Sequence, residues 1–154
     1  MDDLSISRVV HVIAVLFWIG GVGFVTLVLM PTLQATENPK NRLLRFQQIE
    51  GHFAWQARLW VLFAGTSGLW MLARAEMWTR FVDIRFWWMH LMVAIWVIFA
   101  LMLFVIEPLH LHRRLAASTT PEADFARMRR LHQILLSISI ISVFGAVGGS
   151  HGLF

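Results

Sequence analysis

Four long apolar stretches, separated by charged segments, restrict what this chain can fold into. They cover about residues 9–30, 50–74, 86–107 and 128–149, and each meets or approaches the ~20 residues needed to cross ~30 Å of hydrocarbon. The composition agrees, since 58% of the 154 residues are hydrophobic and 14% are charged, against about 25% charged residues in a soluble domain. The sequence therefore predicts one integral membrane domain over residues 1–154.

Capping and breaking residues flank these stretches. Pro31 and Pro108 predict the ends of the first and third spans, because proline does not continue a helix comfortably. Asn38 and Thr120, each followed by proline, are typical of the N-caps of the helices that hold the second and fourth spans. The expected fold is an all-α, four-helix up-down membrane bundle, with spans 1 and 3 on one diagonal and spans 2 and 4 on the other.

The basic residues indicate orientation and not a nucleic-acid partner. Twelve of the 13 are arginines, most of them near the ends of apolar stretches, where they mark the boundary between lipid and water. Nine lie in segments 31–58 and 107–133, and four lie on the other side. This excess predicts that segments 31–58 and 107–133 face the cytoplasm and that both termini face the periplasm or exterior, with the lipid bilayer around the spans.

Several kinds of chemistry are excluded by composition and spacing. Cysteine is absent, which excludes disulfides, thiolate metal sites, cysteine catalysis and covalent c-type haem attachment. The chain also shows no nucleotide-binding loop, no Ser/His/Asp spacing and no paired carboxylates. Whether the protein is an enzyme stays open.

Histidine is the informative polar residue, with seven copies in a chain that has few ionisable groups. His110 and His112 lie in a basic segment and are expected to form a solvated collar. The others lie inside or at the ends of spans, where ionisable groups are costly and usually face the bundle interior. They are His11, His52, His90, His132 and His151.

Four of these histidines form two pairs, each pair on diagonal helices and at the same expected depth in the membrane. His11 and His90 each lie about a turn below the periplasmic surface, whereas His52 and His132 lie near the cytoplasmic surface. Neighbouring helices pack at 8–10 Å, so diagonal helices are about 12–14 Å apart. That gap suits a flat macrocycle between two imidazoles, which predicts haem b ligated by His11 and His90. His52 and His132 are the candidates for a second haem, or else they face lipid headgroups.

Other polar residues could support such a site. His151, at the end of the fourth span, is a weaker candidate for a metal ligand. Arg74 and Arg85 are expected to neutralise haem propionates at the periplasmic side. Arg58, two turns inside the second span, is expected to snorkel to the interface or to pair with Glu50, or else to meet a propionate or another anionic ligand.

A resemblance to a known family begins at His11. Residues 11–21, HVIAVLFWIGG, resemble the H-x6-W-x-G-G opening of the CopD-like and HemJ-like small bacterial membrane proteins. Met30-Pro31 resembles the Leu-Pro of HemJ-like chains, and residues 87–91, WWMHL, resemble their W-x-x-K-L segment. Residues 148–152, GGSHG, look like the tail of CopD-like members.

The resemblance implies a protein of the bacterial inner membrane that binds haem b, together with protoporphyrinogen oxidation or with copper resistance and uptake. The family's lysine haem ligand falls on His90, which implies two histidine ligands in this chain. After Pro31, however, residues 32–34, TLQ, replace the Arg-Leu-Phe string of HemJ-like chains and the histidine that follows it. This departure counts against the oxidase activity and leaves haem binding in place.

Two functions follow as expectations. The first is a haem b cytochrome that passes electrons within the membrane, to or from a quinone or a redox partner protein, or that acts as an oxidoreductase on a small substrate at the periplasmic side. The second is copper transport, in which methionine thioethers bind Cu(I); the methionines considered are Met30, Met71, Met77, Met89, Met92 and Met102. A structural subunit of a larger complex and a homo-oligomer remain open alternatives.

Overall fold

The computed structural model describes residues 2–111 and 119–153, apart from the side chains of residues 108–111. The predicted collar at His110 and His112 therefore lies outside the described side chains. The helical elements are α1 (Asp3–Phe24), π-helix η1 (Val25–Leu29), α2 (Met30–Thr36), α3 (Pro39–Arg74), 3₁₀ helices η2 (Met77–Phe81) and η3 (Ile84–Phe86), α4 (Trp87–Leu101), π-helix η4 (Met102–Leu111) and α6 (Pro121–Ser150).

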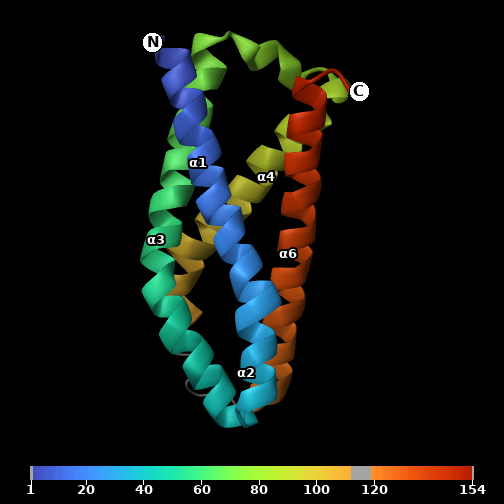
Figure 1. Ribbon diagram of the computed structural model, residues 1–154. Helices are drawn as coiled ribbons and strands as arrows, with labels where there is room; N and C mark the ends of the chain where they lie inside the picture. Colours follow the sequence, from blue (N-terminus) through green and yellow to red (C-terminus); the bar gives the residue numbers. More distant parts are fainter. Residues whose placement is uncertain (1, 112–118, 154) are drawn as a thin grey trace.

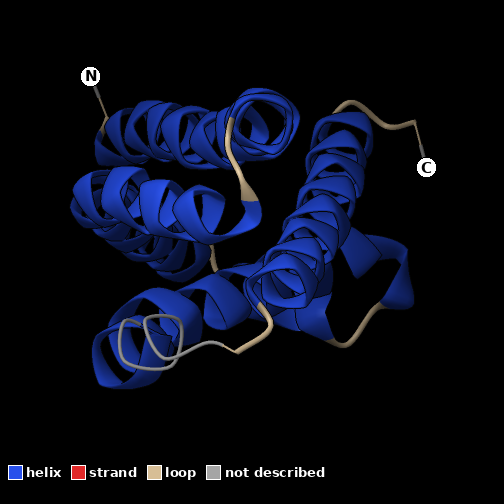
Figure 2. Cartoon of the chain, turned by 90° about the horizontal axis from the view of Figure 1, so that it is seen from below, coloured by secondary structure: helices blue, strands red, loops and turns tan. Residues whose placement is uncertain are grey.

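These elements form four long rods that run alternately up and down (Figure 1). The first rod, α1 to α2, packs mainly against α3, and α4 packs mainly against α6. Both ends of the chain lie at the same end of the bundle (Figure 1). The perpendicular view in Figure 2 shows only helices and connecting loops over the described residues. The predicted all-α fold is confirmed.

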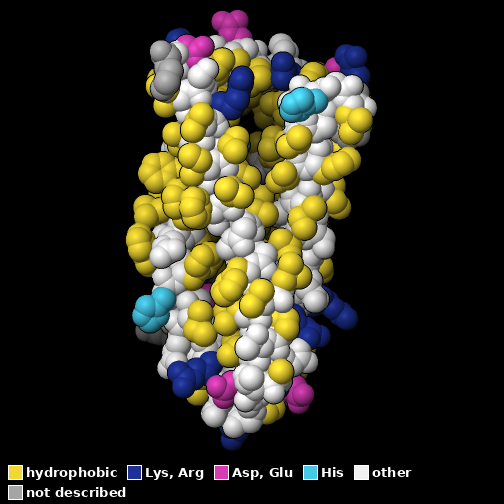
Figure 3. Space-filling view, viewed as in Figure 1, with side chains coloured by type: hydrophobic (Ala, Val, Ile, Leu, Met, Phe, Trp, Pro, Cys, Tyr) yellow, Lys and Arg dark blue, Asp and Glu magenta, His cyan; other side chains and the backbone are white. Residues whose placement is uncertain are grey.

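Three of the rods are long and apolar enough to cross a membrane: Asp3–Thr36, Ile84–Glu107 and Pro121–Ser150. Helix α3 spans 36 residues but is not among them. Large apolar side chains such as Leu16, Leu27 and Leu69 are more than half exposed. Figure 3 shows this apolar surface between two ends where charged side chains gather. A belt of this kind is suited to hydrocarbon, so the chain is a membrane protein in contact with lipid.

The expected helix breaks at two prolines are wrong. The chain stays helical through Pro31 to Thr36, and it stays helical past Glu107 to Leu111. In both places a π-helical segment, η1 or η4, adjoins or contains the proline. A π segment changes the hydrogen-bonding register of the helix, so it offers a place for a residue that has no N–H to donate. The helices are consequently longer than the predicted spans.

The predicted helix starts are confirmed. Helix α3 begins at Pro39, and the side-chain oxygen of Asn38 accepts a hydrogen bond of 3.0 Å from the backbone N–H of Asn41. Helix α6 begins at Pro121, directly after Thr120. Both helices therefore extend well beyond the apolar stretches that they carry.

Two clusters of buried side chains hold the rods together. One surrounds Trp18 of α1, whose ring meets that of Phe99 edge-on at 5.1 Å. The other surrounds Phe46 of α3 and Phe125 of α6, whose rings also meet edge-on, at 6.1 Å. A cavity borders the first cluster on the side of the chain ends.

Candidate functional site

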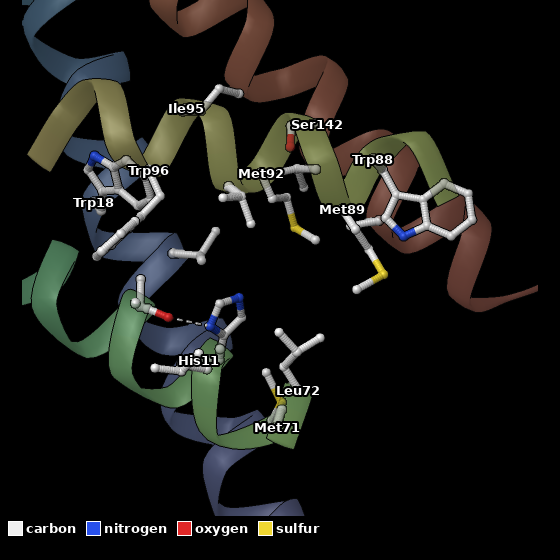
Figure 4. Close-up of a pocket in the computed structure, with 18 of the residues that line it drawn as sticks. His11, Trp18, Met71, Leu72, Trp88, Met89, Met92, Ile95, Trp96 and Ser142 are labelled. Carbon is white, nitrogen blue, oxygen red and sulfur yellow. Dashed lines mark hydrogen bonds between the residues drawn. The ribbon is translucent and has the colours of Figure 1, made fainter. Parts of the chain in front are cut away.

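The cavity has a volume of about 590 Å³ and lies among α1, α3, α4 and α6, with η2 at its rim (Figure 4). A volume between about 300 and 1,000 Å³ is typical of sites that bind small molecules and cofactors. The lining is almost entirely apolar and includes the rings of Trp18, Trp88 and Trp96. Its few polar residues are His11, Thr66, Arg80, Ser139 and Ser142.

His11 is held on the cavity wall in one tautomer. Its Nδ1 lies 2.9 Å from the backbone carbonyl oxygen of Ala64 and 3.2 Å from the hydroxyl oxygen of Ser67. A carbonyl oxygen only accepts, so Nδ1 carries the proton and donates it to Ala64. The other nitrogen, Nε2, then keeps its lone pair, and Figure 4 shows it directed into the cavity. This is how a histidine that ligates a metal is usually oriented.

The glycine at position 68 makes room for this imidazole. A Cβ atom at Gly68 would lie 3.1 Å from His11 Cε1 and 3.4 Å from Nδ1. The first distance is tighter than nearly all real Cβ contacts, so a side chain here would press on the ring. Gly68 therefore helps to set where His11 lies.

Three buried polar atoms on the cavity wall have no hydrogen-bond partner within the described part of the chain. They are Ser139 Oγ, Ser142 Oγ and Trp18 Nε1, and their residues are 1%, 2% and 5% exposed. The exposed Ser137, on the same helix, instead donates to the carbonyl of Gln133. Leaving a buried polar group unpaired costs about 1–3 kcal/mol, so these atoms indicate a ligand that supplies the missing partners.

Four methionines line the same cavity: Met71, Met77, Met89 and Met92. They come from α3, η2 and α4, so residues scattered in the sequence meet around one space. Figure 4 shows the sulfur of Met92 directed into the space between α4 and His11. The other two methionines considered from sequence lie elsewhere, Met30 fully buried in the second cluster and Met102 against the first.

The structure does not bring His11 and His90 together. His90 is exposed, and its Nε2 donates to the backbone carbonyl of Phe81 at 2.9 Å. On a helical period it shares a face with Ala94, Val97 and Leu101, all of them exposed. The face of α4 that lines the cavity carries Met89, Met92 and Trp96 instead. His90 is therefore on the outward face of its helix.

The other histidines do not line the cavity either. His52 is exposed and His132 half-buried; their Nδ1 atoms donate to carbonyls one turn back in the same helices, at 2.8 and 3.0 Å. The imidazole of His132 also meets the ring of Phe46 edge-on at 5.9 Å. His151 is exposed and donates to the carbonyl of Val147 at 2.8 Å. Neither His52 nor His132 is among the residues that line the cavity at His11.

The arginine at the cavity rim is Arg80, which lines the cavity, and not Arg74 or Arg85. Arg74 pairs with Asp3 and Arg85 with Asp83, each at 2.7 Å. Hydrogen bonds from Arg85 hold the pKa of Asp83 below its usual range, so this pair is charged at neutral pH. For Arg80 no ion pair is found within the described residues, and its guanidinium lies 4.9 Å from the centre of the Phe86 ring. It is the cation placed to meet an anionic ligand.

Arg58 also differs from expectation. Its guanidinium lies 3.3 Å from a carboxylate oxygen of Glu107 and donates to the backbone carbonyl of Leu103 at 3.0 Å. The expected pairing with Glu50 is wrong, because Arg58 reaches across to η4 and does not bond along its own helix. This pair lies away from the cavity lining.

The chemistry of the donors narrows what the cavity could hold. Over the residues that the structure describes, no three His, Asp, Glu or Cys side chains lie close enough to bind a metal ion. A metal at His11 therefore needs a macrocycle that brings its own ligands, or sulfur ligands from the methionines. Sequence spacing did not reveal Arg80 as a residue of this site, although the i, i+3 interval between Met89 and Met92 can be seen in the sequence.

Comparison of the chain with protein-family models, with curated proteins and with solved structures finds no match. The function is therefore argued from the geometry of this cavity.

Proposed function

We propose that this protein is a membrane cytochrome that binds haem b in the cavity, with His11 as an axial ligand, and that it transfers electrons. One observation carries the proposal: the Nδ1 proton of His11 is donated to Ala64 at 2.9 Å, so the Nε2 lone pair faces the cavity. Haem supplies one-electron chemistry, and the protein supplies its ligand, its orientation and a dry environment.

The lining of the cavity suits a large, flat, mostly apolar group. Trp18, Trp88 and Trp96 offer ring surfaces, and the indole of Trp96 is fixed by a hydrogen bond of 2.8 Å to the carbonyl of Val61. The unpaired hydroxyls of Ser139 and Ser142 offer donors to a polar edge. Such a mixture of many apolar contacts and a few polar ones is typical of cofactor sites.

The charged groups of haem also find a partner at the rim. A propionate needs a cation close to the interface, and Arg80 lies at the cavity without an acidic partner among the described residues. Charge-assisted hydrogen bonds between arginine and a carboxylate are among the strong polar interactions in proteins. We therefore assign Arg80, in place of Arg74 and Arg85, to the propionates.

The setting that we propose is the bacterial inner membrane with four spans, of which α3 forms the second. The apolar segments of α1, α4 and α6 support three of them, and α3 is included because it packs along α1 over the same depth. Nine basic residues in segments 31–58 and 107–133, against four elsewhere, favour periplasmic termini. The electron partner that we propose is a quinone or a redox protein.

A second candidate is a copper site, supported by the thioethers around the same cavity. Met71, Met77, Met89 and Met92 line it together with His11. Thioether and imidazole donors suit Cu(I). Copper and haem would use the same imidazole nitrogen, so the two assignments exclude each other at His11.

The deciding experiment is a spectrum and a metal analysis of the purified protein in detergent. A sharp b-type α band in the reduced-minus-oxidised spectrum, with about one haem per chain by pyridine haemochrome, is expected. His11→Ala should abolish the band. His52→Ala, which removes an exposed histidine that bonds only to its own helix, should leave it unchanged. Stoichiometric copper without haem would replace the first proposal by the second.

A further inference from the structure

We propose that Met92, and not His90, is the residue of α4 that faces the haem iron, so that the ligands are one imidazole and one thioether. This inference rests on the proposed haem site at His11. Two features of the chain support it: the face of α4 that lines the cavity, and the depth of Met92 on that face relative to His11.

The face of α4 is fixed by its contact with α3. Trp96 donates to the carbonyl of Val61, and its ring occupies the space where a Cβ on Gly65 would stand. With Trp96 inward, Met92 and Met89 follow on the same face at i−4 and i−7. At about 100° per residue, His90 lies about 100° around the helix from Met89, about 120° from Trp96 and about 160° from Met92, and it is exposed.

The depth of Met92 matches that of His11. Helices α3 and α4 run in opposite directions, and Trp96 meets α3 at Val61. The partners of His11, Ala64 and Ser67, lie three and six residues further along α3, about 4.5–9 Å at 1.5 Å per residue. Met92 lies four residues from Trp96 in the same direction, about 6 Å. Met89, at about 10.5 Å, lies nearer the rim.

The orientation of the side chains agrees with this assignment. Figure 4 shows the thioether of Met92 directed from α4 into the cavity, toward the side where His11 projects. The Nε2 of His90 is instead bonded to the backbone carbonyl of Phe81, and His90 does not line the cavity. A His–Met pair raises the reduction potential of a haem relative to two nitrogen ligands, which favours an electron acceptor of higher potential.

The test uses the purified, haem-loaded protein and four substitutions: Met92→Leu, Met89→Leu, Met102→Leu and His90→Ala. The wild type should show the near-infrared charge-transfer band of thioether-ligated ferric haem. Met92→Leu should lose that band and lower the midpoint potential while one haem per chain remains on His11. Met102→Leu, which removes a thioether outside the cavity lining, and His90→Ala should leave both measurements unchanged.

Each other outcome overturns a defined part of the argument. A wild-type spectrum of bis-histidine haem that changes in His90→Ala would overturn the assignment to Met92. So would loss of the thioether band in Met89→Leu and its retention in Met92→Leu. If Met92→Leu does not fold, the wild-type spectrum alone still decides between thioether and imidazole. A folded wild type without haem contradicts the proposed function itself, which is a separate result.

Discussion

The Nδ1 atom of His11 lies 2.9 Å from the carbonyl oxygen of Ala64, on the neighbouring helix α3. This contact fixes the tautomer of the imidazole and also ties α1 to α3 at the level of the cavity. Because Ser67 lies 3.2 Å from the same nitrogen and Gly68 leaves room for the ring, one short piece of α3 sets the position of the ligand. The predictions below test this site and the groups around it.

A side chain at Gly68 should displace His11. In Gly68→Ala the new Cβ would stand 3.1 Å from His11 Cε1, so the ring has to shift by a few tenths of an ångström. We expect weaker haem retention and a shifted α band, and a larger effect in Gly68→Val. The measurements are the haem stoichiometry and the reduced spectrum.

Gly51→Ala is the matched control, since it lies in the same helix with open space around the added Cβ. It should leave the spectrum unchanged and raise helix stability by up to about 1 kcal/mol, the usual difference between glycine and alanine. Equal spectral effects of the two substitutions would show that Gly68 does not set the position of His11.

Removing the unpaired hydroxyls should change stability and binding in opposite directions. Ser139 Oγ and Ser142 Oγ are buried and have no partner among the described residues, so Ser139→Ala and Ser142→Ala remove a desolvation cost of about 1–3 kcal/mol from the ligand-free protein. We expect a higher thermal midpoint without ligand and weaker haem binding. Ser137→Ala, at an exposed hydroxyl that bonds to Gln133, should change neither by much. A lower midpoint for both buried variants would indicate that these hydroxyls have partners within the protein.

Replacing Arg80 should weaken haem binding, whereas replacing Arg74 or Arg85 should not. Arg80→Gln removes the cation at the rim, and a lost hydrogen bond to a charged group costs about 1.5–3 kcal/mol, which corresponds to about a tenfold or greater loss of affinity. Arg74→Gln and Arg85→Gln remove cations already paired with Asp3 and Asp83. Haem transfer to apomyoglobin is the measurement. Equal rates of haem transfer from all three variants would contradict the assignment of Arg80 to the propionates.

The long helices could be predicted from the sequence, because the length of the apolar stretches, the charged segments between them and the capping residues all indicate helices. Asn38 and Thr120 marked helix starts that the structure confirms. The rotation of α4 could not be predicted, because both its faces are apolar: Val97 and Leu101 are as hydrophobic as Ile95 and Trp96. With no amphipathic signal, nothing in the pattern distinguished the outward His90 from the inward Met92.

The same limit explains the site residues that were missed. His11 was identifiable because an ionisable residue in an apolar span is rare. Ser139 and Ser142 could be identified from the sequence only as small polar positions, because serines are common in membrane helices and usually bond to their own backbone, as Ser137 does. Only the packing of α6 against the cavity shows that Ser139 and Ser142 lack such a bond within the described part of the chain.

The ion pair between Arg58 and Glu107 should stabilise the junction of α3 with η4. The Glu107 side chain is 10% exposed, and its carboxylate lies 3.3 Å from the Arg58 guanidinium. Glu107→Leu leaves a half-buried cation without its partner, which costs about 3–5 kcal/mol for a fully buried pair and less here, since Arg58 is 33% exposed. Replacing both residues, as Arg58→Met with Glu107→Leu, should recover most of the loss, because well-packed apolar side chains commonly substitute for an ion pair without loss of stability. Thermal unfolding of the three variants in one detergent measures this. A constant haem spectrum with a lower thermal midpoint would show that the ion pair stabilises the fold and does not affect the haem site. A double variant no more stable than Glu107→Leu would show that the lost stability does not come from the unpaired cation.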